Sequence, residues 1–301
     1  MPLLKTEAEK LSNNHLEGGV IEEIIDRDEM FALLPFQRVD SKALVYNREK
    51  TLPGAEWLDP NDEITESAAT FEEIVAKLRI LGGDVDVDNF LNETMGDTND
   101  QLVTQIKAKA KAVNRQFHLC VAAGDNDKNA KQFDGLPKMV TDEQTIEAGA
   151  DGGAITLTML DELKDKVPLR PDAFIMRSGT RRAILNAMRL AGGTTPPMIT
   201  LENFNGAPVL AHDGVPILVN DFLAADEVQG TNAKTCSVYA VRFNEVDGLV
   251  GLYGGQTAGV RVEHVGTVQN KDAQRIRVKW YVSLALKSTK SIARLKGVTN
   301  I

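Results

Sequence analysis

Apolar and polar residues alternate strictly near the C-terminus, along the stretch RIRVKWYVSLALK, residues 275–287. One face of this stretch carries Ile276, Val278, Trp280, Val282, Leu284 and Leu286. A period of two predicts a half-buried strand. At ~3.3 Å per residue the strand would span roughly 43 Å, whereas strands usually contain about five or six residues. An element of similar length must therefore cover its apolar face.

Residues 97–123 predict that covering element, because they contain no Gly or Pro and show helical periodicity. Thr98–Gln101 matches a capping box, and at ~1.5 Å per residue the helix would be roughly 40 Å long. Its apolar stripe consists of Leu102, Ile106, Val113, Phe117 and Cys120 or Val121, with Ala110 bridging the gap. The strand residues that we expect beneath this stripe are Val278, Trp280 and Val282.

Residues 1–40 are charged with scattered apolar clusters, and they are typical of an arm rather than a domain. Residues 41–81 form a long excursion that starts with a strand pattern and is rich in turn formers, such as Pro53-Gly54 and Asp59–Asp62. We expect a single chain to leave apolar residues of both segments uncovered. The resulting candidates for contact with neighbouring subunits are Val20, Ile21, Ile24, Phe36, Trp57 and Leu58.

Trp57 stands between two turn signals in a mostly polar stretch, and it has two explanations. It packs locally on its own hairpin, against Leu52 and Leu58, or it is buried only when subunits assemble.

The limb at residues 71–81 fits two kinds of element. Phe71, Ile74, Val75 and Leu78 follow helical spacing, and Thr70 with Glu73 matches a capping box. The same limb fits one strand face through Ile74, Ala76, Leu78 and Ile80. Local rules alone favour the helix.

Residues 146–254 predict a mixed α+β unit with short connections. TLTMLDELKDKV is typical of a helix and AFIMR of a strand, and a second helix would begin with Ser178 as its N-cap and end at Gly192. A hairpin is indicated at Asp213-Gly214, followed by strands in TCSVYAVRF and GLVGLYGG.

Charge and chemistry exclude several functions. The net charge of −9 is unlike that of a basic nucleic-acid binder, and no apolar run approaches the ~18 residues of a membrane span. Two cysteines make no disulfide framework and suggest reducing cytoplasm.

No phosphate loop or nucleophile elbow occurs. DVDVDN, residues 84–89, fails as a calcium loop because it lacks the required Gly and Glu, which leaves a strand with one acidic face. We expect no metal or cofactor, and we expect His212 to be a solvent-exposed loop residue.

Five arginines cluster between residues 170 and 189, among them Arg181 and Arg182. They lack interleaved aromatic residues, so an interface is favoured over nucleic-acid recognition. In so acidic a chain, the expected partner is a carboxylate on a neighbouring subunit.

Several segments in order resemble the major capsid proteins of tailed bacteriophages, which have the Hong Kong 97 fold. GGVIEEI, LLPF and VYNRE resemble the family's N-terminal arm leading into its extended loop. A helix ending in Gly124-Asp125 and followed by FDGL resembles the end of the spine helix, and DGVPILVNDFL resembles an axial-domain strand. RIRVKWYVSLALKSTKSIARLKGV resembles the closing strand beside the spine helix.

The resemblance implies an α+β Hong Kong 97-like capsid fold. Its parts would be an arm at residues 1–40, an extended loop at 41–81, a peripheral domain at 82–145 and 255–301 with a spine helix at about 97–123, and an axial domain at 146–254. It also makes the limb at residues 71–81 a strand.

The implied function is that of a structural head protein, not an enzyme, which self-assembles as hexamers and pentamers into an icosahedral shell around the double-stranded DNA of a tailed phage or prophage. Implied partners are a separate scaffolding protein, a portal protein and packaged DNA, with room for a decoration protein. The protein would reside in the virion and assemble in the host bacterial cytoplasm. Two alternatives stay open: an encapsulin-like compartment that encloses cargo, and an α+β enzyme with an unrecognised site.

Overall fold

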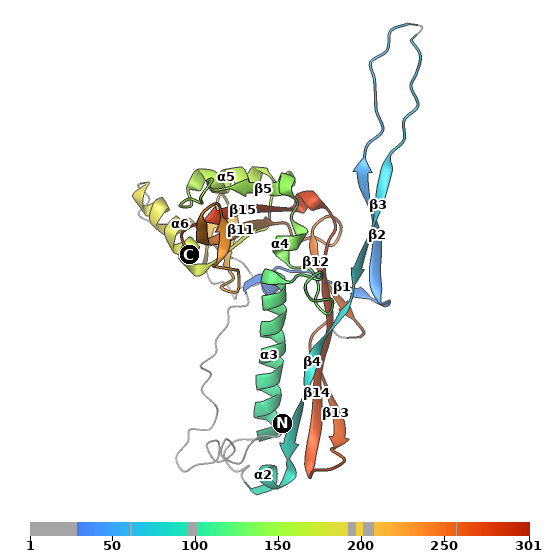
Figure 1. Cartoon of the computed structure of the whole chain (residues 1–301), viewed down its shortest axis with the longest axis vertical. Helices are drawn as coiled ribbons and strands as arrows, with labels where there is room; N and C mark the ends of the chain where they lie inside the picture. The colour runs from blue at the N-terminus through green and yellow to red at the C-terminus, as the bar shows by residue number, and fades with distance from the viewer. Residues whose placement is uncertain (1–28, 61, 95–100, 192–196, 201–207, 257) are drawn as a thin grey trace.

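The computed structural model describes residues 29–60, 62–94, 101–191, 197–200, 208–256 and 258–301. Three parts are evident in Figure 1: a long helix beside long strands, a compact body of strands and helices, and a hairpin that projects from their junction. The arm candidates Val20, Ile21 and Ile24 lie outside the described residues, as does the capping box before residue 101.

A five-stranded sheet is built on β14 (Ala273–Leu286). Its other strands are β1 (Phe36–Val39), β4 (Arg79–Asp88), β12 (Leu249–Gly254) and β13 (Arg261–Thr267). β4 pairs antiparallel with β14 over ten consecutive residue pairs, from Asp88 opposite Ala273 to Arg79 opposite Val282. The predicted long strand is therefore present and lies at the centre of its sheet.

Helix α3 (Gln101–Ala123) lies along this sheet (Figure 1). Phe117 is completely buried, and its ring centroid is 4.9 Å from that of Trp280. Val113, Phe117, Val278, Trp280 and Val282 belong to one buried core cluster. Leu102 and Ile106, near the start of the helix, are half-buried and lie outside that cluster.

The compact body contains an eight-stranded sheet around β11 (Asn232–Val241). The other strands are β5 (Thr145–Glu147), β6 (Ala173–Met176), β7 (Met198–Thr200), β8 (Pro208–His212), β9 (Val215–Val219), β10 (Glu227–Gln229) and β15 (Ile292–Val298). Helices α5 (Leu157–Asp165) and α6 (Ser178–Leu190) lie against it. β8 and β9 pair through a turn in which Asp213 and Gly214 both have positive φ, so the hairpin prediction is confirmed.

The projecting hairpin consists of β2 (Ala43–Thr51) and β3 (Thr70–Lys77). Only Leu78 separates β3 from β4, so the limb at residues 71–81 is strand and the helical spacing was misleading. Pairing with two distant strands, β2 and β14, outweighs the local preference. Short helical segments complete the fold: η1 (Glu29–Ala32), α2 (Asn89–Thr94), α4 (Leu136–Met139), η2 (Asp142–Gln144) and η4 (Thr289–Ser291).

Two further expectations are corrected. Ser178 is not the N-cap of α6: Arg177 occupies that position, and the Asp221 carboxylate accepts from the Ser178 backbone N–H at 2.9 Å. His212 is not a solvent-exposed loop residue, because it ends β8, its side chain is 14% exposed, and its Nε2 lies 2.6 Å from Oδ1 of Asp161.

Sheet membership cuts across the expected domain division. β12, from the expected axial segment, pairs with β14, and β15, from the expected peripheral segment, pairs with β11. The division at residue 254 stays a prediction, and these two strands tie the two sheets together.

Candidate assembly surfaces

The tip of the β2–β3 hairpin exposes several apolar side chains. Trp57 is fully exposed, and Leu52, Leu58 and Ile64 are exposed as well. The local explanation for Trp57, packing against Leu52 and Leu58, is therefore not what the structure shows. Apolar side chains gathered on a projecting element are typical of a protein–protein contact.

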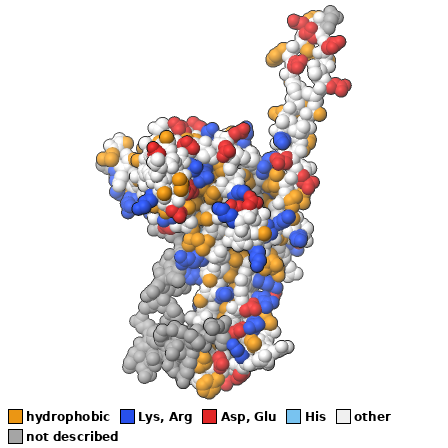
Figure 2. Space-filling view, viewed as in Figure 1, with side chains coloured by type: hydrophobic (Ala, Val, Ile, Leu, Met, Phe, Trp, Pro, Cys, Tyr) orange, Lys and Arg blue, Asp and Glu red, His pale blue; other side chains and the backbone are white. Residues whose placement is uncertain are grey.

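The same tip is strongly acidic. Residues 51–69 contain five carboxylates, Glu56, Asp59, Asp62, Glu63 and Glu66, and no Lys or Arg. Figure 2 shows these acidic side chains beside hydrophobic ones at the far end of the hairpin. A surface complementary to this tip would combine apolar side chains with positive charge.

The root of the hairpin is fixed to the end of β14. The hydroxyl of Tyr46 donates to the Leu286 carbonyl at 2.7 Å, and Arg48 donates to the carbonyls of Leu286 and Lys287 at 2.8 and 3.0 Å. The Lys287 ammonium lies 4.7 Å from the Tyr46 ring centroid. Burial lowers the pKa of Lys287 and raises that of Tyr46. The hairpin is therefore anchored at one end and free at the other.

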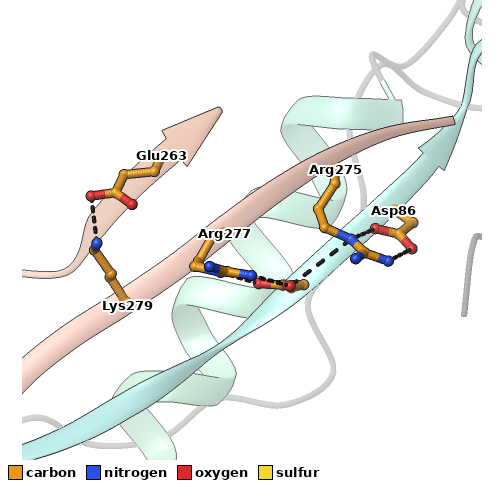
Figure 3. A network of polar contacts seen from close by, with 6 residues as sticks. Asp86, Glu263, Arg275, Arg277 and Lys279 are labelled. Carbon is orange, nitrogen blue, oxygen red and sulfur yellow. Dashed lines mark hydrogen bonds and ion pairs between the residues drawn. The ribbon is translucent and has the colours of Figure 1, made fainter. Parts of the chain in front are cut away.

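The expected acidic face of residues 84–89 is neutralised by arginines of β14. Arg275 forms a bidentate pair with Asp86, with both bonds at 2.7 Å, and Arg277 forms one with Asp84 at 2.7 and 2.8 Å. Lys279 continues the row by pairing with Glu263 of β13 at 2.6 Å (Figure 3). Hydrogen bonds from Arg277 and Arg275 hold the pKa values of Asp84 and Asp86, respectively, below their usual range.

Sequence reasoning missed this ladder, although a signal was present. Acidic residues recur every second position in β4, and basic residues do so at Arg275, Arg277 and Lys279. Two strands with opposite charges at the same period can pair in register, as these do.

Phe36 is half-buried against its own chain, and its contact with a neighbouring subunit stays a prediction. Its ring lies 5.9 Å from that of Phe31 and 6.0 Å from that of Trp280, and it packs over Gly251 on the parallel strand β12. A side chain at Gly251 would collide with this ring, so the glycine makes room for it.

The arginines of α6 face outward in part. Arg182 is exposed and Arg181 is half-buried, and neither forms an ion pair with any of the described residues. Arg177 differs, since it donates to the carbonyls of Asp221 and Leu223. Their pairing with a carboxylate of another subunit stays a prediction.

Within the part of the chain that the structure describes, no group of three or more His, Cys, Asp or Glu side chains is arranged to hold a metal ion. The helices in that part include none of the length and apolar character needed to cross a membrane.

Comparisons with known proteins rest on structure, because the sequence matches no protein-family model and no curated protein. The chain is similar to a subunit of the holo-SrpI encapsulin complex from Synechococcus elongatus PCC 7942, with a TM-score of 0.72 and 21% identity over 99% of this chain and 96% of that one. It is also similar to the capsid of the native GTA particle, with a TM-score of 0.69 and 14% identity over 96% of both chains.

The capsid of Myoviridae phage XM1 is similar too, with a TM-score of 0.65 and 12% identity over 98% of this chain and 99% of that one. The chain has the Hong Kong 97 capsid fold. This fold accounts for the long helix beside long strands, the projecting hairpin and the compact body, whereas the assignment of the last two to an extended loop and an axial domain stays a prediction. Identities this low establish the fold, and the expected fold class is confirmed.

Proposed function

We propose that the protein is a structural subunit that assembles with copies of itself into a closed shell. The hairpin carries this proposal, because Trp57 and Leu52 are exposed at its tip. An exposed aromatic anchor on an extended arm is costly in a monomer and useful in an interface. Similarity to both capsid and encapsulin subunits supports the same reading.

The specific form that we propose is the major head protein of a tailed phage or prophage, enclosing double-stranded DNA. Capsids predominate among the similar structures, and a net charge of −9 would keep the inner wall from binding DNA tightly. Hexamers and pentamers would build the shell with a separate scaffolding protein and a portal protein, and a decoration protein could be added. The site of assembly would be the host bacterial cytoplasm.

An encapsulin-like compartment is the second candidate, and a specific observation favours it. The similarity to the SrpI encapsulin complex has 21% identity and a TM-score of 0.72, against 12–14% and 0.65–0.69 for the GTA and XM1 capsids. Such a shell would enclose protein cargo in place of a genome.

Electron microscopy of the expressed protein, with and without its upstream gene product, tests the proposal. Closed shells are the expected result, and dependence on the upstream product identifies a scaffolding protein. Particles from the native host should contain nuclease-protected double-stranded DNA if the head reading is right, and protein cargo without DNA if the encapsulin reading is right. A compact monomer that binds a small ligand would instead revive the enzyme alternative.

A further inference from the structure

A cavity of about 490 Å³ lies where β4 leaves β14 and the chain continues into the hairpin. The last pair between these strands is Arg79 opposite Val282, whereas β14 runs on to Leu286 and β3 turns away to pair with β2. The cavity, here called the fork cavity, lies between β3 and the end of β14, and residues of the segment 126–139 also line it. Its size falls within the ~300–1,000 Å³ typical of sites for small molecules.

Apolar side chains from three segments line the fork cavity. They are Ile74, Ala76, Phe133, Met139, Leu284 and Leu286. Tyr46 and Arg48 line the end near Leu286, where both donate to its carbonyl. From Val282 to Leu286, β14 advances roughly 13 Å at ~3.3 Å per residue. An elongated apolar body therefore suits the space between the two ends.

Cations outnumber carboxylates around the fork cavity. The charged residues that line it are Arg48, Lys77, Arg79, Lys138 and a single carboxylate, Asp134. Lys138 pairs with Asp127, but Lys77 and Arg79 form no ion pair with any of the described residues. A surplus of cations is an exception in a chain whose net charge is −9. The fork cavity therefore favours an anion.

Arg79 carries the most specific feature of the fork cavity, an incomplete pair of donors. Arg275 and Arg277 each use Nε and Nη2 together to hold one carboxylate. In Arg79 the Nη2 donates to the Asn126 amide oxygen, whereas the buried Nε has no partner among the described residues. A buried donor without an acceptor lowers stability, and an oxygen of a carboxylate or phosphate would supply the acceptor.

We infer that the fork cavity binds a small amphipathic anion. Its carboxylate or phosphate head lies at Arg79 and Lys77, and its aliphatic body lies along Leu284 and Leu286. The cations and the apolar lining all come from one chain, so the inference goes beyond shell formation and does not depend on it.

Isothermal titration calorimetry of the full-length chain tests the inference with octanoate and octyl phosphate as probes. At least one of them should bind, once per chain. Octanol and octylamine have the same tail without the negative charge, and acetate and inorganic phosphate have the head without the tail. All four should bind at least tenfold more weakly than the better probe. A preference for octyl phosphate would identify the ligand as a phosphate ester, and a preference for octanoate would identify it as a carboxylic acid.

Substitutions at the head site provide the second measurement. Arg79→Gln should weaken binding of the better probe roughly tenfold, because it removes a charge and a pair of donors. Lys77→Gln, at an exposed position where folding should not change, should weaken it roughly threefold. Arg38→Gln and Lys271→Gln, exposed and outside the fork cavity, are matched controls that should bind as the parent does.

Hydrogen exchange locates the bound probe. Saturation with the better probe should slow the exchange of amides in residues 74–77 and 133–139, which line the fork cavity, and should leave those of β11 unchanged.

Four outcomes overturn the inference. Absence of binding by both probes would reject the site, and octanol or octylamine binding as tightly as the better probe would reject an anion as its ligand. Full binding by both Arg79→Gln and Lys77→Gln would reject the head site, and protection confined to other segments would reject the fork cavity. None of these results bears on shell formation, which electron microscopy tests separately.

Discussion

Phe117 joins the long helix to the long strand through its ring. It contacts the rings of Phe31 at 5.2 Å, Trp280 at 4.9 Å and Phe133 at 5.5 Å, and no part of it is exposed to solvent. Aromatic pairs at such distances add stability beyond the burial of their area. One residue thus supports the contact between three segments that are distant in sequence.

Phe117→Ala should therefore lower the free energy of unfolding by about 3–5 kcal/mol. Denaturant unfolding of unassembled subunits measures this change. Gln116→Ala, at the exposed neighbouring position, is the matched control and should stay close to the parent. A Phe117→Ala chain with unchanged stability would contradict the helix-on-strand packing.

Trp57→Ala should affect association and not folding, the opposite of what we expect for Phe117→Ala. Because the side chain is fully exposed, folding stability should not change, whereas association should weaken by roughly 2–4 kcal/mol if Trp57 is an interface anchor. Sedimentation at several protein concentrations measures association, with Val246→Ala at another exposed apolar position as control.

Fluorescence reports the burial of Trp57 directly. In a Trp280→Phe background that still folds, emission should shift to the blue on assembly. An unchanged spectrum, with normal assembly of Trp57→Ala, would remove Trp57 from the interface.

Single residues could be predicted where burial follows from periodicity alone. The exposure of the hairpin tip follows from turn chemistry, and the faces of β14 follow from alternation as far as Val282; beyond it Ser283 and Ala285, on the expected polar face, are buried as well. Phe36 and Ser178 could not, because their surroundings come from distant segments: Phe31 and Gly251 for the first, and Asp221 for the second.

At the scale of elements, β4 shows what local rules cannot supply. Its neighbour in the sheet, β14, is nearly two hundred residues away, and charge matching between the strands holds their register. The resemblance to a known family gave the correct assignment of strand for residues 71–81. A family's fold specifies which distant strands pair, and the spacing of neighbouring residues does not.

The charge ladder predicts a particular pH dependence. The pKa of Asp86 is lowered in the folded chain, mainly by hydrogen bonds from Arg275, so its contribution to stability is complete above its ordinary pKa of about 3.9 and disappears as pH falls below that value. Asp86→Asn should lower stability at pH 7 and reduce the loss of stability between about pH 5 and pH 3.

Denaturant unfolding across this pH range measures the difference. Glu49→Gln, at an exposed position of β2, is the control and should follow the parent curve. If the free energy of unfolding of Asp86→Asn fell with pH in parallel with that of the parent, the Asp86–Arg275 pair would make no pH-dependent contribution to stability.

The hairpin root gives a second prediction at this scale. Arg48→Gln removes bonds to the carbonyls of Leu286 and Lys287, so the amides of β2 and β3 should exchange with deuterium faster while those of β11 do not change. Arg38→Gln, whose side chain pairs with Asp40 near the surface, is a suitable control. Equal exchange in all three chains would mean that the root is held by other contacts.

At the scale of the whole molecule, the order of elements identified the fold where no single motif did. A capsid-like plate needs one long helix, long strands beside it, a projecting hairpin and a compact second sheet, and each left a pattern in the sequence. The sequence did not predict that β12 would join the sheet of β14 and β15 the sheet of β11, because chain order does not specify which sheet a strand joins.

The assembly state is the prediction that belongs to this scale. At micromolar concentration the protein should sediment as hexamers, pentamers or shells, because the free hairpin leaves its apolar tip exposed in a monomer. Analytical ultracentrifugation that finds only a compact 32.8 kDa species would contradict it.

The free end of the hairpin has a consequence for inheritance. Since residues 52–58 are exposed and the Trp57 side chain is fully exposed, a mutation there should leave folding unchanged and act only when two chains meet. Two lineages could then diverge in this short stretch alone, fold identically, and sort into separate particles when made in the same cell.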